Sequence, residues 1–313
     1  TTSVIFPLTE DQKTKMPEMV DLMKGLQDLQ ANVSSEEASA LKKRMSQIKP
    51  EEVRPFLEEL NLFAIYAHGT HVAGIAAKGN PKAVVMPARI TFDHKMIPDP
   101  PTREKSERFA QAAKEAVSYF KENDVKIVNM SFGGSPEDVE AAMEANGMGE
   151  NAEERKRQAR ELFEIEKEGM FEAIKSAPEI LFVTSAGNSD QDSEFYEAIP
   201  ASFELHNILT VGAVDQAGEE TSFTSFGKIV DVQANVFEVD SYIPGGQTMK
   251  MSGTSMSSPN VANLAAKLWA LNPNLSVQEV IALIKEGCDT NADGRITLIN
   301  PQASVELLKS RMN

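Results

Sequence analysis

Short apolar stretches alternate with helical stretches over most of the chain, and this alternation constrains the fold most. Residues 83–90, 125–130, 179–185 and 207–214 have the composition of buried strands, and residues 104–122 have a helical pattern. Strands that alternate with helices form a parallel sheet covered by helices on both faces. The sequence therefore predicts a three-layer α/β fold, with the residues that carry chemistry near the carboxyl ends of its strands.

A helical region precedes the alternation. Met16, Met19 and Met23 recur at the three- and four-residue spacing of one apolar helical face. A second helix is expected further along, and Pro50 suits the first turn of a third, short helix that ends near residue 60. We expect these helices to form an insertion at residues 9–60.

A second helical stretch, at about residues 136–170, interrupts the alternation. Its mixed charges are typical of a solvated helix with ion pairs along its surface. We find no internal repeat and no low-complexity linker. The sequence therefore predicts one domain over residues 1–313 that carries two helical insertions.

The net charge excludes two classes of binding partner, and the cysteine count excludes an intrachain disulfide. Asp and Glu total 47 against 31 Lys and Arg, so the formal net charge is −16. Nucleic acids and anionic membrane surfaces both attract Lys and Arg, so neither is an expected partner. No apolar run approaches the roughly 18–20 residues that span a bilayer, and the N-terminal residues show no signal-peptide pattern. Cys288 is the single cysteine, which rules out an intrachain disulfide.

Three segments combine the residue types needed for acyl transfer. They read His-Gly-Thr-His-Val-Ala-Gly at 68–74, Ser-Ala-Gly-Asn at 185–188 and Gly-Thr-Ser-Met-Ser-Ser-Pro at 253–259. A serine hydroxyl becomes a good nucleophile when a neighbouring base, usually histidine, takes its proton. The oxyanion that forms needs hydrogen-bond donors, and an asparagine amide can be one. Together the segments supply a base, an oxyanion donor and a nucleophile.

These segments resemble the three signature blocks of the subtilisin-like serine peptidases (subtilases), in the order found in that family. The resemblance implies the subtilisin-like fold, with Ser255 as the nucleophile at the start of a buried helix and His68 as the general base. It likewise implies that Asn188 donates to the oxyanion and that His71 packs behind the site.

The resemblance covers about residues 62–287, apart from the second insertion. Ser131, Phe132 and Gly133 resemble the substrate-binding edge of the family, where an extended peptide pairs with backbone groups. Asn263 stands where a glycine is common, and we expect it to alter helix packing.

The third member of the triad is missing from these segments. A carboxylate must fix the histidine tautomer, and in subtilases it is an aspartate upstream of the histidine, after a strand. The upstream aspartates are Asp11, Asp21 and Asp28; none follows an apolar strand, and Asp21 and Asp28 look solvent-facing. Either the aspartate lies on a segment before Thr1, which we expect because the other roles are kept, or the protein is a pseudo-enzyme. In both cases the isolated chain should be a poor peptidase.

A candidate calcium loop lies near the C-terminus. Asp289, Asn291 and Asp293 place oxygen ligands at alternate positions, with glycine at the sixth. The twelfth position is Asn300 instead of the expected Glu, so the site would be weak, and a polar surface turn is the alternative. No cofactor is expected for catalysis.

The resemblance implies a serine endopeptidase that cleaves polypeptides through an acyl-enzyme. The alternative is a catalytically silent subtilase-fold protein whose helical insertions bind a partner, and an esterase is a third reading. A secreted or periplasmic location follows the habit of the family, although the acidic charge would equally suit an intracellular member. The cleaved N-terminal segment of its own precursor is a further expected partner.

Overall fold

A central sheet organises the computed structural model, which describes residues 8–30, 33–90, 92–192, 197–292 and 294–312. Its six strands lie in the order β1-β2-β3-β4-β8-β7. Strands β1 to β4 and β8 run parallel, and β7 is antiparallel to β8. The strands are β1 (Ile127–Met130), β2 (Leu181–Ser185), β3 (Ile208–Val214), β4 (Val232–Asn235), β7 (Asp289–Thr290) and β8 (Thr297–Leu298).

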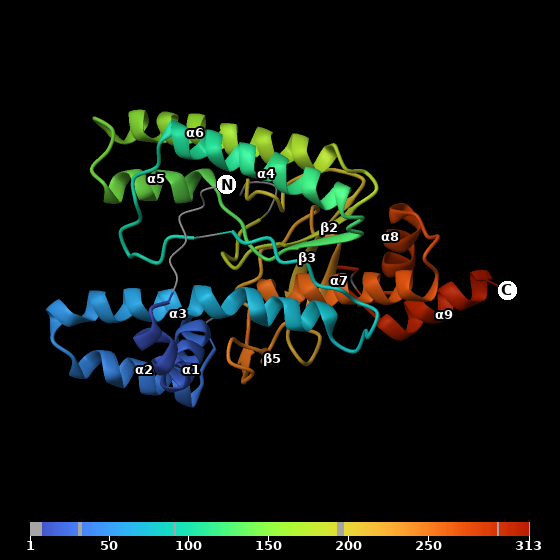
Figure 1. The fold of residues 1–313 in the computed structure, drawn as a ribbon, viewed down its shortest axis with the longest axis horizontal. Coiled ribbons are helices and arrows are strands. Elements are labelled where there is room, and N and C mark those ends of the chain that lie inside the picture. The colour runs from blue at the N-terminus through green and yellow to red at the C-terminus, as the bar shows by residue number, and fades with distance from the viewer. Residues whose placement is uncertain (1–7, 31–32, 91, 193–196, 293, 313) are drawn as a thin grey trace.

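Helices cover both faces of the sheet, as predicted (Figure 1). Every residue of β2 and β3 is buried, which explains their continuous apolar composition. Phe182 of β2 packs toward the helices above the sheet, and Val183 packs toward α7. Above lie α4 (Arg103–Glu122), α5 (Pro136–Ala145) and α6 (Ala152–Lys175), and below lie α3 (Pro50–Ala77) and α7 (Thr254–Leu271). Helices α8 (Val277–Glu286) and α9 (Pro301–Met312) lie at the right-hand end of the view.

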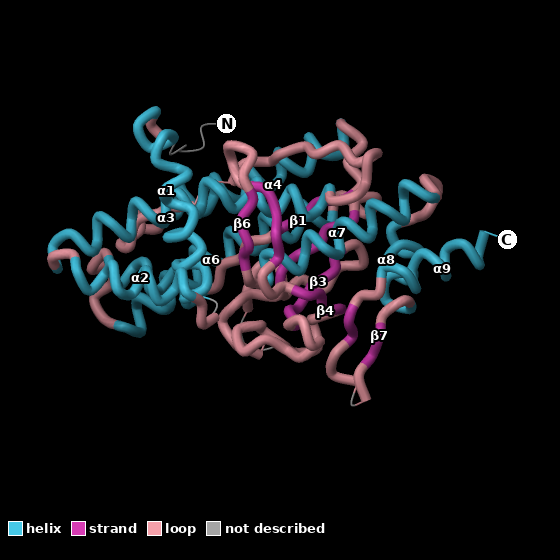
Figure 2. Tube along the Cα trace, turned by 90° about the horizontal axis from the view of Figure 1, so that it is seen from below, coloured by secondary structure: helices cyan, strands magenta, loops and turns pink. Residues whose placement is uncertain are grey.

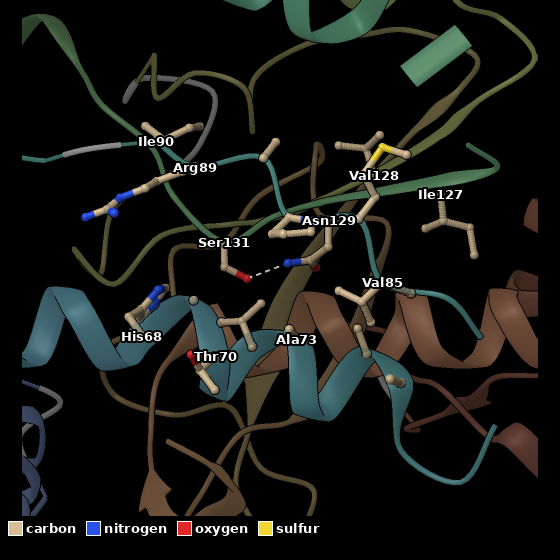
Figure 3. Close-up of a pocket in the computed structure, with 18 of the residues that line it drawn as sticks. His68, Thr70, Ala73, Val85, Arg89, Ile90, Ile127, Val128, Asn129 and Ser131 are labelled. Carbon is tan, nitrogen blue, oxygen red and sulfur yellow. Dashed lines mark hydrogen bonds between the residues drawn. The ribbon is translucent and has the colours of Figure 1, made fainter. Parts of the chain in front are cut away.

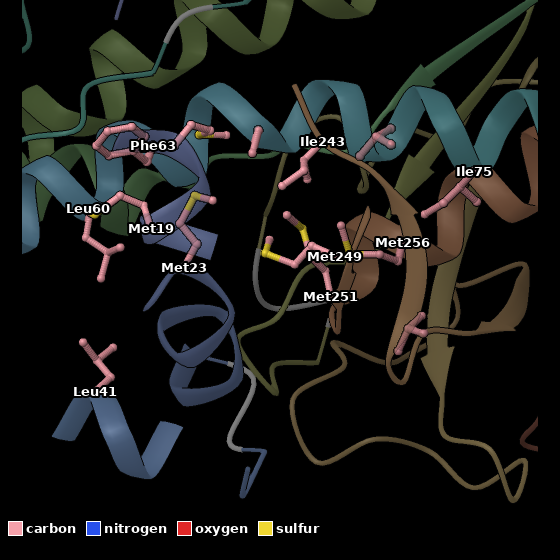
Figure 4. Packing of buried hydrophobic residues seen from close by; sticks show 14 of the residues in the cluster. Met19, Met23, Leu41, Leu60, Phe63, Ile75, Ile243, Met249, Met251 and Met256 are labelled. Atoms are coloured by element: carbon pink, nitrogen blue, oxygen red, sulfur yellow. The ribbon is translucent and has the colours of Figure 1, made fainter. Parts of the chain in front are cut away.

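The expected N-terminal helices pack together at one end of the sheet, opposite α8 and α9 (Figure 2). They are α1 (Glu10–Gln30), α2 (Glu36–Gln47) and the first half of α3. Met19 and Met23 of α1 meet Leu60 and Phe63 of α3 in one core (Figure 4). This core continues into the methionines of the hairpin of β5 (Val239–Tyr242) and β6 (Thr248–Met251). None of the helices in the described residues is long and apolar enough to cross a membrane.

The expectation of a short third helix was wrong. Helix α3 continues to Ala77, so His68 lies inside a helix. Leu60, Phe63 and Ala67 are fully buried and extend one apolar face past residue 60. No proline interrupts the part of α3 that follows residue 60, and its two glycines, Gly69 and Gly74, each cost only about 1 kcal/mol in a helix interior.

The expected strand at residues 83–90 was also wrong. This segment forms no strand, and Val84 is 94% exposed. Its apolar composition is that of a strand, but a strand forms only where a neighbour supplies the hydrogen bonds. Within the described residues, the neighbouring strand β1 lies at the edge of the sheet and pairs with β2 alone.

Asp28 is not solvent-facing as expected but is fully buried. Lys24 Nζ donates to Asp28 Oδ2 at 2.6 Å and to Glu238 Oε1, just before β5, at 2.8 Å. Burial disfavours the charge of Lys24, yet the bonds to both carboxylates leave its pKa above the ordinary value. The ion cluster therefore ties the helical insertion to the hairpin.

Candidate active site

Ser255 lies in the first turn of α7. Ser255 is half-buried, whereas the other residues of the segment 251–259 are all buried. The preceding Gly253 has a φ of +143°, a conformation that side chains other than glycine rarely adopt. The hydroxyl therefore reaches the surface at the positive end of a buried helix, as predicted.

Asn188 sits beside this helix start. Its Oδ1 accepts hydrogen bonds from the Thr254 backbone N–H at 2.9 Å and from the Thr254 hydroxyl at 2.8 Å. These bonds fix the amide, and its Nδ2 donates to no other described residue. Asn188 is exposed, so the free donor faces the solvent beside Ser255. This is the arrangement that an oxyanion donor requires, and Thr254 is a positioning residue that the sequence reasoning missed.

A buried hydroxyl network joins the end of β1 to α7. Ser131 Oγ donates to the Ser255 carbonyl at 2.8 Å, shares a 2.9 Å hydrogen bond with Ser258 Oγ and accepts from Asn129 Nδ2 at 2.9 Å. The Ser255 hydroxyl donates to the Ser131 carbonyl at 3.4 Å. Ser131 thus anchors the nucleophile turn. No role was predicted for Asn129 or Ser258, although Ser258 lies inside the segment at 253–259.

The predicted substrate edge continues from Ser131. Gly133 is exposed, and the half-buried Phe132 lies 6.0 Å from the ring of Phe92, centroid to centroid. The backbone groups of Phe132 and Gly133 form no hydrogen bond with another described residue. Gly134, the next residue, pairs antiparallel with Ile199. The edge therefore offers free backbone groups to an extended peptide.

His68 projects from α3 into a cavity of about 1290 Å³ that Ser131 also lines (Figure 3). Burial, and then the charge of His71, lower the pKa of His68 to about 4, so the ring is neutral and able to accept a proton. Within the described part of the chain, the ring forms no hydrogen bond. The Ser255 hydroxyl is directed to Ser131 instead, so the base and nucleophile are not joined.

His71 has the structural role that was expected. The ring is fully buried, and Nε2 donates to the Met249 carbonyl at 2.8 Å. The His71 carbonyl accepts from the Ser241 hydroxyl at 2.7 Å. These bonds hold the β5–β6 hairpin against α3 behind the site.

No carboxylate of the described residues contacts His68. Asp11 pairs with Lys15 on the surface, Asp21 is exposed, and Asp28 is occupied by Lys24. None of the three candidates can therefore complete a triad. Asn263, the other departure, donates to the carbonyls of Ala76 at 2.9 Å and Lys78 at 2.8 Å, and so fastens the end of α3 to α7.

Among the described residues, no group of three or more His, Cys, Asp or Glu side chains is placed to hold a metal ion. Asp289 Oδ2 accepts from Asn300 Nδ2 at 3.0 Å, and Asn291 Oδ1 accepts from the Ile296 backbone N–H at 2.9 Å. Both oxygens stabilise the turn between β7 and β8. Asp293 lies outside the described residues, so the calcium site stays a prediction.

Several curated bacterial proteases are similar in sequence to this chain. The chain is 30% identical over 217 residues to subtilisin DY of Bacillus licheniformis, covering 68% of this chain and 67% of that protein. It is 29% identical over 219 residues to a thermostable alkaline protease of Halalkalibacterium halodurans, of which it spans 50%. A cell wall-associated protease of Bacillus subtilis is 27% identical over 222 residues, covering 71% of this chain and 21% of that protein.

Solved structures support the fold. A lanthipeptide protease superposes with a TM-score of 0.57 at 15% identity, covering 79% of this chain and 76% of that one. A cold-adapted subtilisin-like serine proteinase gives a TM-score of 0.51 at 24% identity, with coverages of 75% and 73%. The profile of the subtilase family matches residues 59–299, which leaves α1 and α2 outside the match. The chain therefore belongs to the subtilase family, peptidase family S8.

Proposed function

We propose that this chain is the main part of a serine endopeptidase in which Ser255 attacks the peptide carbonyl. His68 takes the hydroxyl proton and later gives it to the leaving amine, and Asn188 Nδ2 donates to the oxyanion. The observation that carries the proposal is the Asn188 amide, which Thr254 fixes beside the half-buried Ser255 hydroxyl. An acyl-enzyme at Ser255 is then hydrolysed by water.

The proposed substrates are polypeptides in extended conformation. The free backbone groups of Phe132 and Gly133 favour strand addition over recognition of a small ester. An extracytoplasmic location is supported by the cell wall-associated relative. A structural calcium ion near Asp289 is proposed on the ligand spacing alone. The carboxylate for His68 would come from the N-terminal segment of the precursor.

The alternative, a silent binding protein, has one observation in its favour, because His68 and Ser255 are not hydrogen-bonded. The two functions are separated by a fluorophosphonate, which labels an activated serine. We expect the full-length gene product to be labelled at Ser255 and a Ser255→Ala variant to remain unlabelled. A folded full-length protein that resists labelling would contradict the enzymatic proposal.

Asn188→Ala tests the oxyanion role separately. Loss of one donor lowers kcat by about 10²–10³-fold. KM should change little, since the donor acts on the transition state. Thr254→Val keeps the size of the side chain but loses the hydroxyl bond to Asn188, so its kcat should lie between those of the wild type and Asn188→Ala. An Asn188→Ala variant with unchanged kcat would assign the oxyanion to other donors.

A further inference from the structure

The substrate edge at residues 131–133 is bordered by a backbone bridge between Gly134 and Ile199. The Gly134 N–H donates to the Ile199 carbonyl at 3.2 Å, and the Ile199 N–H donates to the Gly134 carbonyl at 2.9 Å. The Ile199 carbonyl also lies 3.2 Å from the point where a Cβ atom on Gly133 would stand. A bridge of one residue pair is weak by itself, so the position of the edge depends on what holds each side of the bridge.

Helix α5 holds the Gly134 side. The next residue, Ser135, is buried and caps this helix. Its hydroxyl accepts from the Asp138 backbone N–H at 3.2 Å, and Asp138 Oδ2 accepts from the Ser135 backbone N–H at 2.8 Å. This capping box fixes the direction in which the chain leaves the edge. The substrate edge therefore runs directly into the first helix of the second insertion.

Helix α6 holds the Ile199 side through three charged residues, Arg160, Lys167 and Glu197, which we call the Glu197 cluster. Glu197 Oε2 accepts from Arg160 Nη1 and, at 3.4 Å, from Lys167 Nζ. The two cations stand about two turns apart on one face of α6. The hydrogen bond from Arg160 is the main reason why the pKa of Glu197 lies below its ordinary value, so Glu197 is charged at neutral pH.

The segment that follows Glu197 has two further attachments. The rings of Phe171 on α6 and Phe203 meet edge to face, with their centroids 5.4 Å apart. Thr210 Oγ1 of β3 donates to the Ala201 carbonyl at 2.9 Å. Helix α6 therefore contacts both ends of the segment 197–203, while the sheet holds its middle.

The two insertion helices are also joined to each other. Helices α5 and α6 lie together above the sheet (Figure 1). Arg155 Nη2, in the first turn of α6, donates to Glu144 Oε1 of α5 at 3.2 Å. One pair of helices thus contacts both sides of the bridge. Arg160 and Lys167 belong to the stretch at about 136–170, which the resemblance to the family leaves out.

We propose that the α5–α6 insertion sets the position of the substrate edge, and that Glu197 is the positioning residue through which α6 acts. The backbone groups of Phe132 and Gly133 can pair with an extended peptide only while the bridge beside them is closed. Opening the bridge lowers the fraction of molecules that can bind the peptide, so it raises KM. The inference rests on the proposed function for this effect on KM, whereas the attachment of the edge does not depend on it.

Hydrogen exchange at the amides of Gly134 and Ile199 tests the attachment. Both N–H groups donate across the bridge, so their exchange rates report its opening. We expect Glu197→Gln in the full-length gene product to raise both rates about fivefold, the effect of an ion pair near 1 kcal/mol. Glu161→Gln is the matched control, because it removes an ion pair with Arg157 inside α6, and it should leave both rates unchanged. Unchanged rates in Glu197→Gln would overturn the proposal.

Hydrolysis of casein, an unfolded polypeptide, tests the positioning role. Glu197→Gln should raise KM about two- to fivefold with little change in kcat, and Glu161→Gln should match the wild type. Replacing Arg160 and Lys167 with glutamine should raise KM to the same extent, and adding Glu197→Gln to that variant should have no further effect. A merely structural role would lower the amount of folded enzyme, and hence the apparent kcat, at constant KM. Faster exchange with an unchanged KM would therefore overturn the positioning role.

Failure of the proposed function is recognised separately. A wild-type protein whose Ser255 resists the fluorophosphonate contradicts the proposed function and, with it, any effect of Glu197 on KM. The exchange rates of Gly134 and Ile199 still decide, in that protein, whether Glu197 holds the edge.

Discussion

Replacing Lys24 with methionine should destabilise the protein strongly. Lys24 is 7% exposed and is the cation that pairs with the fully buried Asp28, at 2.6 Å. Asp28 Oδ1 already lacks a partner, so the substitution leaves a buried carboxylate with no hydrogen bond from a described side chain. Removing one member of a buried pair costs about 3–5 kcal/mol. We expect a loss in this range in urea unfolding, followed by circular dichroism.

Matched variants make the magnitude interpretable. Glu238→Gln removes the other partner of Lys24, whose side chain is 24% exposed, and should cost about 1 kcal/mol or less. The double variant Lys24→Met, Asp28→Leu removes both buried charges and should recover most of the stability. A loss below about 1 kcal/mol for Lys24→Met alone would refute the reasoning, because it would mean that water or another cation reaches Asp28.

Three further predictions concern the site and the loop. Burial lowers the pKa of His68 to about 4, below the ordinary 6.5, so its contribution to stability should be complete above pH of about 6.5 and lost as the pH falls toward 4. NMR titration of the His68 ring measures this pKa, and a carboxylate placed beside the ring should raise it. Gly253→Ala should cost about 1–3 kcal/mol, since its φ of +143° strains an L side chain; a thermal melt equal to the wild type would contradict this. Calcium added to metal-stripped protein should raise the melting temperature, and Asp289→Asn should reduce that rise.

The sequence predicted the parts of the molecule whose signal is local. Strands β2 and β3, predicted at 179–185 and 207–214, are buried on both faces, so their composition alone identifies them. The residues near Ser255 were predicted because the three segments at 68–74, 185–188 and 253–259 resemble the signature blocks of the family, in the same order. The structure places Ser255 in the first turn of α7 and buries His71 behind the site, as expected.

The rest depends on contacts between segments that are distant in the chain. Residues 83–90 have the composition of a strand but lack a neighbour, and composition does not reveal a missing neighbour. Asp28 was expected to face the solvent because it is a charged residue inside a helical pattern. Its burial depends on Lys24, which also pairs with Glu238, 210 positions away from Asp28 and directly before β5. The Ser131 network likewise joins a strand end to a helix more than a hundred residues later.

The length of α3 has a consequence for protein engineering. At 1.5 Å per residue its 28 residues form a rod about 42 Å long. Leu60 and Phe63, in the first half, belong to the core of the insertion, whereas His68 stands in the second half. The proposed base therefore lies on a helix whose N-terminal half packs against α1 and α2. Replacing the insertion with a short loop would remove these packing contacts. A shortened variant of this protein should therefore keep the whole of α3.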